Sequence, residues 1–484
     1  MARTAVRVKR ELPSLPIATR AARDRAVTGV LLARSWLQLS VASLLVAGLF
    51  AVLVAAARML PIPRFGDPQF FRVALVAHVA FSLNVWLLAF AACLWTLLLY
   101  SAAPASNAPL GWLGLGAAVT GAVLMAGTSF VGSGTPLLVD YVPVLAHPGY
   151  ELGLLLLFIG VGITAAQYLG VLWRPSASLP AEARLMRLGA ASYLAALVTF
   201  WIAWNAGLGH DPQALAWGGG HLLQVVNAAG LIAAWTLLSP SSLRPGERTF
   251  LVAGATLFLV PGVAVPILSL PLGAIDLGLI GAVTWASVAP PTVAAWALFA
   301  RGLLRDRSWS TAPLGLLVSL ALYAAGIAAA LAGLEGDTRV TAHYHGTVGA
   351  VTVAYMALAY RLLPRLGLAR PRQSIVRLQL VLYGGGLLLF IAGLFWAGAL
   401  GATRKAFESF SPQAGLLSPT LPVLLGALAA VAGGALFVFE SGIHLAGLRR
   451  TPQETQTADR HASPPTSSQG KIYRPVSTRL GPSQ

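Results

Sequence analysis

Long apolar stretches dominate the chain and are separated by short polar turns. Stretches of roughly 20 apolar residues lie near 36–57, 70–100, 110–131, 150–172, 186–208, 214–238, 249–268, 274–300, 312–334, 340–363, 374–400 and 418–446. A helix of about 20 residues rises about 30 Å, which is the thickness of the hydrocarbon core of a bilayer. The turns carry Pro, Gly and Arg, residues typical of helix ends. The pattern therefore predicts an all-α membrane protein, a twelve-helix transmembrane bundle.

Composition supports this prediction and divides the chain into three parts. Only 10% of the 484 residues are charged and 57% are hydrophobic, whereas a soluble domain of this length would need more polar surface. We expect a basic N-terminal segment at 1–30, a twelve-span domain at 31–449 and a disordered tail at 450–484, which is rich in Ser, Thr, Pro and Gln. The N-terminus has no short apolar stretch followed by a cleavage site, so we expect no signal peptide.

The net charge of +17 raises the question of a nucleic-acid partner. With the N-terminus placed in the cytoplasm, twelve spans leave 27 of the 33 Lys and Arg on the cytoplasmic side. The exceptions are Arg58, Arg64, Arg72, Arg339, Arg404 and Lys405. Because basic residues are retained on the cytoplasmic side of membrane proteins, this bias reflects topology. We expect no nucleic-acid partner, and a multi-pass protein of a prokaryotic plasma membrane with both termini cytoplasmic.

Four histidines lie at membrane depth in the predicted spans. His78, His221, His343 and His345 are placed roughly 5 to 12 Å from the outer ends of their helices, so three helices bring four imidazoles to one slab. Ionisable groups at this depth are costly, and they mark either a functional site or internal pairing.

His343 and His345 are two positions apart on one predicted helix. Residues two apart on an α-helix point about 200° apart, so these imidazoles cannot bind the same ion. The arrangement suits one helix between two planar cofactors that each take one axial imidazole, with Gly346 and Gly349 allowing a macrocycle or a neighbouring helix to approach. The alternative is a pair of core histidines bonded to neighbouring helices.

The run from Ala342 to Gly367, which contains His-Tyr-His-Gly-Thr and ends in Leu-Leu-Pro-Arg-Leu-Gly, resembles the tenth helix of subunit I of the haem-copper oxidase superfamily. It is most similar to the B-type oxidases and the alternative nitric oxide reductases, and the twelve spans follow the family in order and spacing. The resemblance implies that His78 and His345 bind a low-spin haem, that His343 binds a high-spin haem, and that His221 is a ligand of the second metal.

Two loops extend the resemblance. Arg404-Lys405 is similar to the Arg-Arg turn that neutralises haem propionates before helix twelve, and the alternative is a pair of ordinary interfacial charges. The stretch Asp140–Pro148 is similar to a segment before helix four in some members. We expect its His147 to be a solvated loop residue and not a ligand.

The sequence also departs from the family. The adjacent histidine pair of helix seven is missing from the region Pro261–Pro271, and Val225 stands where many oxidases have a tyrosine after the helix-six histidine. A copper held by His221 alone would be weakly bound, so neither copper nor non-haem iron is supported. Gln224 and Asn227 could hydrogen-bond a distal ligand or support an unusual metal, or they could bridge helices.

The resemblance implies a dihaem membrane subunit of a respiratory terminal oxidase-like complex. Electrons would pass from the low-spin to the high-spin haem, of undetermined type, for reduction of O2, as in cytochrome c oxidase, or of NO. Besides membrane lipid, a small cytochrome c or copper-bearing subunit is expected as electron donor, because one cysteine and no Cys-x-x-Cys-His leave no such centre here. The alternatives are a dihaem electron-transfer or gas-sensing protein without the second metal, and a transporter whose histidines are structural.

Overall fold

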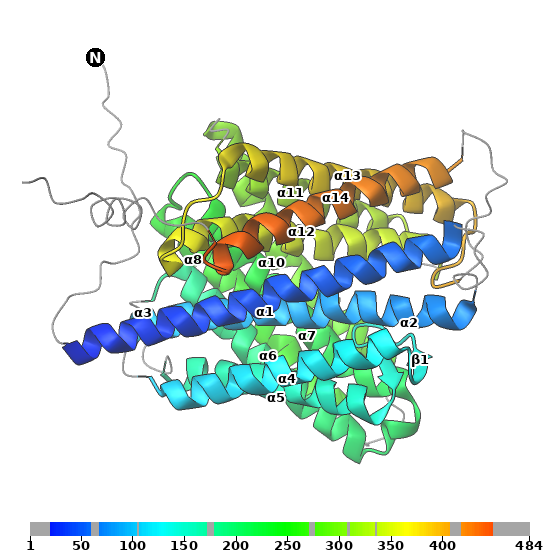
Figure 1. The fold of residues 1–484 in the computed structure, drawn as a ribbon, viewed down its shortest axis with the longest axis horizontal. Coiled ribbons are helices and arrows are strands. Elements are labelled where there is room, and N and C mark those ends of the chain that lie inside the picture. Colours follow the sequence, from blue (N-terminus) through cyan, green and yellow to red (C-terminus); the bar gives the residue numbers. More distant parts are fainter. Residues whose placement is uncertain are drawn as a thin grey trace, which may run out of the picture.

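The structure is a computed structural model that describes residues 20–59, 67–103, 106–171, 179–270, 276–306, 310–333, 336–406 and 418–448. The predicted tail at 450–484 and residues 1–19 of the predicted basic segment lie outside these ranges. The helices lie side by side with their axes along one direction (Figure 1). The end of the bundle at which α1 finishes and α2 begins is called the outer end here, following the orientation that the sequence predicts.

Within the described residues, twelve helical spans are long and apolar enough to cross a membrane, which confirms the predicted architecture. Ten of them contain a single α-helix and two are interrupted. In chain order the helices are α1 (Arg20–Met59), α2 (Pro68–Val79), η1 (Ala80–Val85), α3 (Trp86–Ala102), α4 (Ala108–Val131), α5 (Pro148–Val171), α6 (Ala181–Asn205), η3 (Leu208–His210), α7 (Pro212–Leu238), α8 (Pro245–Ala255), η4 (Thr256–Phe258), α9 (Leu259–Leu268), α10 (Leu277–Arg305), α11 (Thr311–Leu331), α12 (Thr338–Leu362), η5 (Leu363–Leu366), α13 (Gln373–Ala399) and α14 (Thr420–Leu445).

Two spans change helical type part-way along their length, and the span of α12 ends in the 3-10 turn η5. The second span passes from α2 through the π-helical η1 into α3, and the seventh passes from α8 through the 3-10 turn η4 into α9. The π-helical segment begins two residues after His78, and the Ser82 hydroxyl donates to the His78 carbonyl at 2.7 Å. Single π-helical turns inside α-helices are frequent at functional sites.

Aspartates cap four of the helices that start at the outer end. Asp67, Asp211, Asp276 and Asp337 precede α2, α7, α10 and α12, and each side chain accepts a hydrogen bond from a backbone N–H of the first turn. A carboxylate at this position satisfies a backbone donor and lies at the positive end of the helix dipole. These caps fix where the histidine-bearing helices begin.

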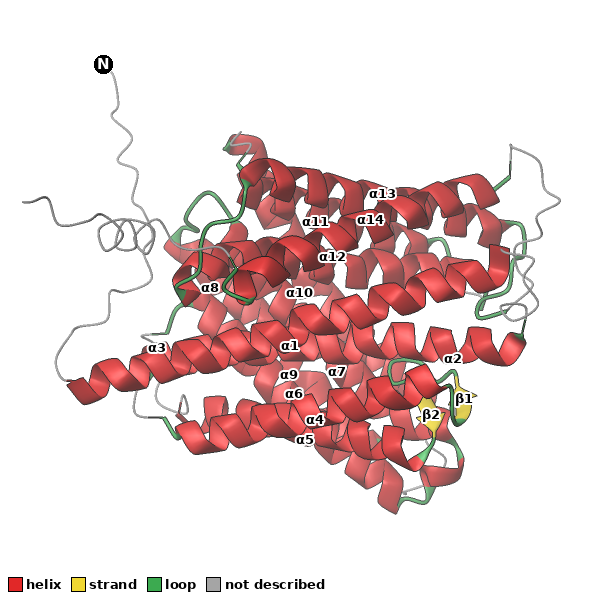
Figure 2. Ribbon diagram, in the orientation of Figure 1, coloured by secondary structure: helices red, strands yellow, loops and turns green. Residues whose placement is uncertain are grey.

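A short β-hairpin at the outer end was not predicted. Strands β1 (Thr135–Leu137) and β2 (Val144–Ala146) pair antiparallel, with Thr135 opposite Ala146, in the connection between α4 and α5. The hairpin lies at the end of the bundle opposite the start of α1 (Figure 2). Its connecting residues, which include Asp140 and Tyr141, are thereby held over the outer ends of the helices.

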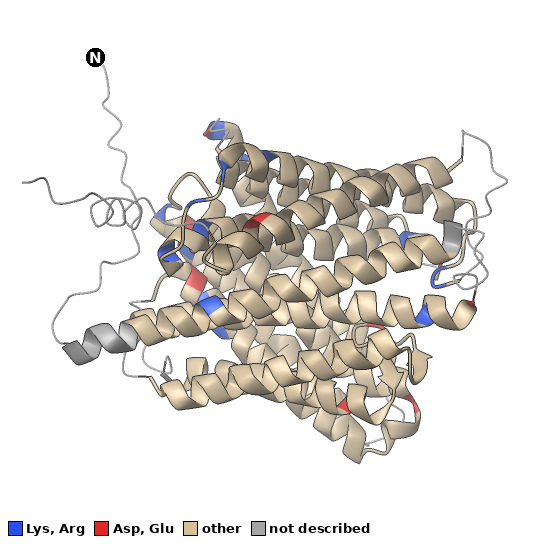
Figure 3. Cartoon of the chain, viewed as in Figure 1, with Lys and Arg blue, Asp and Glu red and all other residues tan. Residues whose placement is uncertain are grey.

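The basic residues separate the two ends of the bundle. Lys and Arg gather at the end where α1 starts, and few lie at the outer end (Figure 3). This distribution matches the bias that the sequence shows along its loops.

Three spans form the centre of the bundle. In their most apolar windows, α7 has 89% of its residues buried, the span of α12 has 83% and the span of α2 and α3 has 72%, against 17–50% for the other nine. All four histidines of the predicted slab lie on these three spans. The bundle therefore places its ionisable imidazoles in its most enclosed helices.

Candidate functional site

The inner and outer halves of α12 differ in how tightly they are packed. Every residue from 349 to 360 is buried, whereas most residues from 339 to 348 are only partly buried, although both halves belong to a central helix. His343 and His345 are among the partly buried side chains, and His78 on α2 is as well. His221 on α7 is buried, with 4% of its surface exposed. Protein side chains thus enclose the outer half of α12 less completely than the inner half.

His343 and His345 face different neighbours. The His343 ring stacks on Trp285 of α10, with ring centroids 5.5 Å apart, and its Nδ1 lies 2.8 Å from the carbonyl oxygen of Gly326 on α11. The His345 ring meets Phe390 of α13 edge-on at 5.0 Å. The two imidazoles therefore point to opposite sides of α12, as the helical periodicity predicts.

A backbone carbonyl fixes the tautomer of each of the four imidazoles. Nδ1 lies 3.0 Å from the Ala47 oxygen in His78, and 2.8 Å from the oxygens of Trp217 in His221, Gly326 in His343 and Thr341 in His345. A carbonyl oxygen can only accept, so Nδ1 carries the proton and Nε2 of the neutral ring keeps a free lone pair. Metal-binding histidines are oriented in this way by their second nitrogen.

The Nε2 atoms then divide into two kinds. Among the residues that the structure describes, none hydrogen-bonds to Nε2 of His78, His343 or His345, so these three nitrogens remain able to bind iron. Nε2 of His221 instead lies 3.2 Å from the hydroxyl of Tyr141, which donates to it. Three of the four imidazoles are open and one is capped by tyrosine.

Tyr141 was missed by sequence reasoning. It lies 80 positions before His221, in the loop that follows β1, and its ring centroid is 4.7 Å from that of His221. Gly220 makes room for it, since a Cβ at that position would come within 2.6 Å of the Tyr141 Cβ. The run of glycines before His221 was the signal available in the sequence, but it does not say which residue fills the space.

His221 and His343 both lie against the same face of α10. A Cβ added to Gly281 would lie 3.7 Å from Nε2 of His221, and Trp285 stacks on His343. Residues four apart share a helix face and are separated by about 6 Å along the axis. The capped imidazole and one of the open imidazoles therefore lie along the same face of α10.

The donor set consists of single imidazoles and not of a cluster of metal ligands. In the described part of the chain, one imidazole without a bonded Nε2 lies on each side of α12, and a single axial imidazole is enough to hold a haem iron. No group of three or more His, Cys, Asp or Glu side chains occurs within the described ranges. Gln224 accepts a hydrogen bond from Asn227 of the same helix at 3.3 Å.

Gly346 and Gly349, which follow the two histidines of α12, allow neighbouring helices to pack closely. A Cβ on Gly346 would lie 2.4 Å from the Cα of Gly326 on α11, and one on Gly349 would lie 2.4 Å from Leu387 of α13. Of the two possibilities that the sequence left open, a macrocycle or a neighbouring helix, the described contacts are those of helices. The close approach at Gly326 also delivers the carbonyl that orients His343.

Arg404 and Lys405 are joined to Asp140 at the outer end, and these three residues with Gln213 are called the Asp140 clamp. Lys405 Nζ lies 2.6 Å from Asp140 Oδ1, and Arg404 Nη2 lies 3.1 Å from Oδ2. Gln213 of α7 donates to Oδ2 at 3.3 Å and accepts from the Asp140 backbone N–H at 3.0 Å. The clamp ties the hairpin loop, α7 and the loop after α13 together.

The electrostatics of the clamp follow from this geometry. Burial alone would raise the pKa of Asp140, but the hydrogen bonds and charges of Lys405 and Arg404 outweigh it and hold that pKa below its usual range. Burial and the neighbouring Asp140 charge raise the pKa of Tyr141. Tyr141 therefore keeps its phenolic proton at neutral pH.

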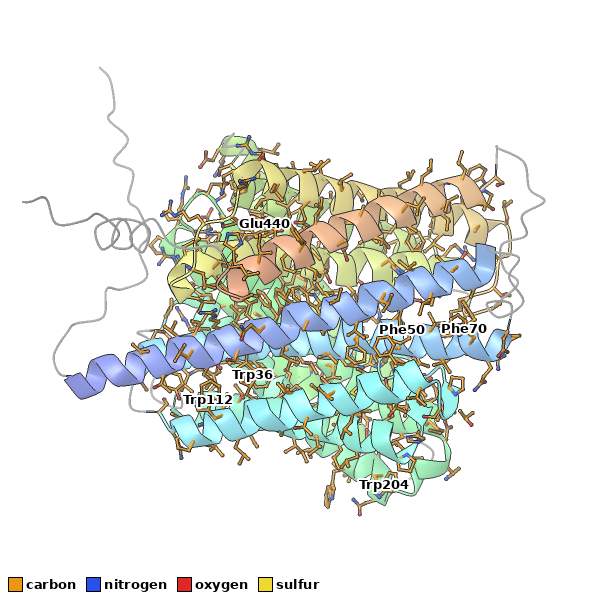
Figure 4. The ribbon with its side chains drawn as sticks, viewed as in Figure 1. Trp36, Phe50, Phe70, Trp112, Trp204 and Glu440 are labelled. Atoms are coloured by element: carbon orange, nitrogen blue, oxygen red, sulfur yellow. The ribbon has the colours of Figure 1, made fainter. Side chains whose placement is uncertain are left out.

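Three further ionisable residues, His147, Glu440 and His444, hydrogen-bond to backbone groups. Nδ1 of His147 accepts from the N–H of Gly149 at 3.1 Å in the loop before α5. Glu440 lies on the last two turns of α14, at the inner end (Figure 4). Nδ1 of His444 lies 2.6 Å from the backbone carbonyl oxygen of Glu440. The Glu440 carboxylate accepts a hydrogen bond from the backbone N–H of Arg372 at 3.2 Å.

Fold and sequence comparison together define the class of membrane protein. The family model described as cytochrome c and quinol oxidase polypeptide I matches residues 32–429, so the chain belongs to this family and is a haem-copper oxidase subunit I-like membrane protein. A relative from Aquifex aeolicus (strain VF5), described as an uncharacterized protein, is 29% identical over 341 residues, which cover 69% of this chain and 84% of the relative.

Proposed function

We propose that this chain is the dihaem subunit of a respiratory oxidase-like complex, with O2 or NO as the ligand of one haem. The observation that carries the proposal is the set of three imidazoles whose Nδ1 atoms are fixed by carbonyls and whose Nε2 atoms are open, two of them on opposite sides of α12. Family membership supports haem as the group they bind.

Each residue has a distinct part in this proposal. His78 and His345 would hold the low-spin haem from two sides, and His343 would hold the high-spin haem and leave its other face open. Haem iron would supply electron transfer and a binding position for a diatomic ligand. Arg404 and Lys405 would offset propionate charge, which they can share with Asp140 because each cation has several donors.

The surroundings of the complex follow from topology. We place the protein in a prokaryotic plasma membrane with both termini in the cytoplasm, as the basic residues favour (Figure 3). A cytochrome c or copper-bearing partner subunit would deliver electrons at the outer end, near the His78 and His345 pair.

A second candidate function is electron transfer or gas binding without multi-electron turnover. It is favoured by the described residues having no three-ligand group that could hold a second metal. A transporter with structural histidines would not need three imidazoles that each keep an open Nε2.

The proposal is tested by reduced-minus-oxidised spectra of the purified protein, with and without carbon monoxide, together with metal counting. His345→Ala should remove the low-spin signal and keep the carbon monoxide complex, and His343→Ala should do the reverse. His147→Ala is the matched control, because His147 lies in a loop, and it should change neither signal. A preparation without haem, or signals that survive both substitutions, would refute the proposal. Copper or non-haem iron at one per chain would argue against the second candidate.

A further inference from the structure

The capped imidazole sets His221 apart from the other three histidines of the slab. Its Nδ1–H is committed to Trp217 and its Nε2 accepts from Tyr141, so both ring nitrogens are already hydrogen-bonded within the protein. A metal ion at this Nε2 would have to displace the tyrosine, and the described residues offer no three-ligand group to hold it.

The positive backbone φ of Tyr141 indicates that the surrounding structure holds this residue in a strained conformation. Tyr141 has φ 67° and Lys405 has φ 59°, and they are the only non-glycine residues with positive φ in the described ranges. A bulky side chain in this region is an outlier, and such strain persists where the surrounding structure determines it. Tyr141 directly follows Asp140 and Lys405 pairs with it, so both strained positions lie beside the ion pair that joins the hairpin loop to the loop after α13.

We propose that Tyr141 and His221 form a hydrogen-bonded distal pair that stands in place of a second metal, with the Tyr141 hydroxyl as the hydrogen-bond donor to a diatomic ligand. This inference rests on the proposed function, since it needs the ligand to bind at a haem on His343. Asp140 is the positioning residue of the pair, because the clamp holds the loop on which Tyr141 lies.

The donor must be the tyrosine. With Nδ1–H directed at Trp217, the neutral His221 ring has no other proton to offer, whereas the phenolic hydroxyl carries one. A hydroxyl hydrogen can turn about its C–O bond, so Tyr141 can redirect it from Nε2 to a ligand without moving the ring. His221 then serves as the resting acceptor of this proton.

The Tyr141–His221 pair lies on the same side of α10 as His343, the proposed ligand of the high-spin haem. Nε2 of His221 is beside Gly281, one helical turn along α10 from Trp285, which stacks on His343. The hydroxyl of Tyr141 is 3.2 Å from that nitrogen. The donor and the proposed high-spin ligand thus lie along one face of the same helix.

The test uses carbon monoxide on the reduced protein and cyanide on the oxidised protein, in the wild type and in Tyr141→Phe. Loss of a donor should move the C–O stretch to higher wavenumber and raise the cyanide dissociation constant about 2- to 10-fold. Asp140→Asn, which loosens the clamp and keeps the hydroxyl, should move both readouts in the same direction by less.

Tyr150→Phe is the matched control. Tyr150 is buried, and its hydroxyl donates to the Pro143 carbonyl of the same loop at 3.3 Å, so its loss perturbs the loop and leaves the pair intact. Should Tyr141→Phe fail to fold, Tyr141→Gly provides the second variant, because glycine adopts positive φ without strain and carries no side-chain donor. An unchanged low-spin spectrum shows that a variant is folded.

The outcomes separate the two proposals. A haem-containing protein whose carbon monoxide and cyanide complexes are indifferent to Tyr141 would overturn the distal pair and leave the dihaem assignment standing. One copper or non-haem iron per chain that is lost in His221→Ala would also overturn it. Wild-type protein that forms no carbon monoxide complex would count against the proposed function itself.

Discussion

Replacing Gly346 by alanine should disturb one haem site and spare the other. A Cβ at this position would lie 2.4 Å from the Cα of Gly326, 2.5 Å from its nitrogen and 2.9 Å from the Leu322 carbonyl oxygen. All three atoms are backbone atoms of α11, so no side chain can rotate away. Since ordinary contact begins near 3.4 Å, α11 and α12 must separate by about 1 Å.

That separation acts on His343 through its orienting hydrogen bond. The Gly326 carbonyl lies 2.8 Å from His343 Nδ1, and an extra 1 Å would take the contact beyond hydrogen-bonding distance. Overpacking of this kind costs about 1–3 kcal/mol of stability. Loss of the group that hydrogen-bonds to a metal-binding histidine typically lowers metal affinity about 10- to 100-fold. His345, which bonds to Thr341 of its own helix, should keep its orientation.

The assay is a titration of haem content by visible spectroscopy, combined with thermal denaturation in detergent. Gly346→Ala should lose the carbon monoxide-binding haem before the low-spin haem. Gly385→Ala on α13 is the control, because a Cβ there meets nothing within 4 Å, and alanine should be neutral or stabilising by up to about 1 kcal/mol. Equal behaviour of the two variants, or equal loss of both haems, would refute the reasoning.

Two further predictions concern the clamp and the buried core. Asp140→Asn should destabilise the protein by about 1–3 kcal/mol, because two cations lose their partner. The pKa of Asp140 is lowered on folding, so this stabilising contribution is present above the unfolded pKa of about 3.9 and is lost as pH falls through the folded value. The difference in melting temperature between wild type and variant should therefore stay constant from about pH 7 to 5 and shrink only below about pH 4. A difference that changes between pH 7 and 5 would contradict it. Ser319→Ala should also cost about 1–3 kcal/mol, since Trp235 Nε1 donates to Ser319 at 2.8 Å and would be left buried and unpaired. Haem spectra should not change, and a melting temperature equal to that of the wild type would count against this account.

The sequence predicted what depends on local periodicity. Apolar runs of membrane length located all twelve spans, because each span is set by its own residues. The 100° step of the α-helix was enough to place His343 and His345 on different sides of one helix, and the contacts to Trp285 and Phe390 follow that geometry.

Contacts between distant parts of the chain were beyond such reasoning. Tyr141 reaches His221 across 80 positions, and Asp140 reaches Arg404 across 264. Neither pairing leaves a periodic signal, and the positive φ of Tyr141 is not a conformation that its residue type favours. Arg404 and Lys405 could be recognised as outer-end cations, but their acidic partner depends on how the hairpin loop folds over α7.

The measurement that tests the central claim most directly is the number of haems per chain in the purified wild-type protein, from the pyridine haemochrome spectrum and a protein assay by amino-acid analysis. The account predicts two haems, because open imidazoles on opposite sides of α12 each bind one macrocycle. A protein with no haem, or with one haem that disappears only when His343 and His345 are both replaced, would contradict it.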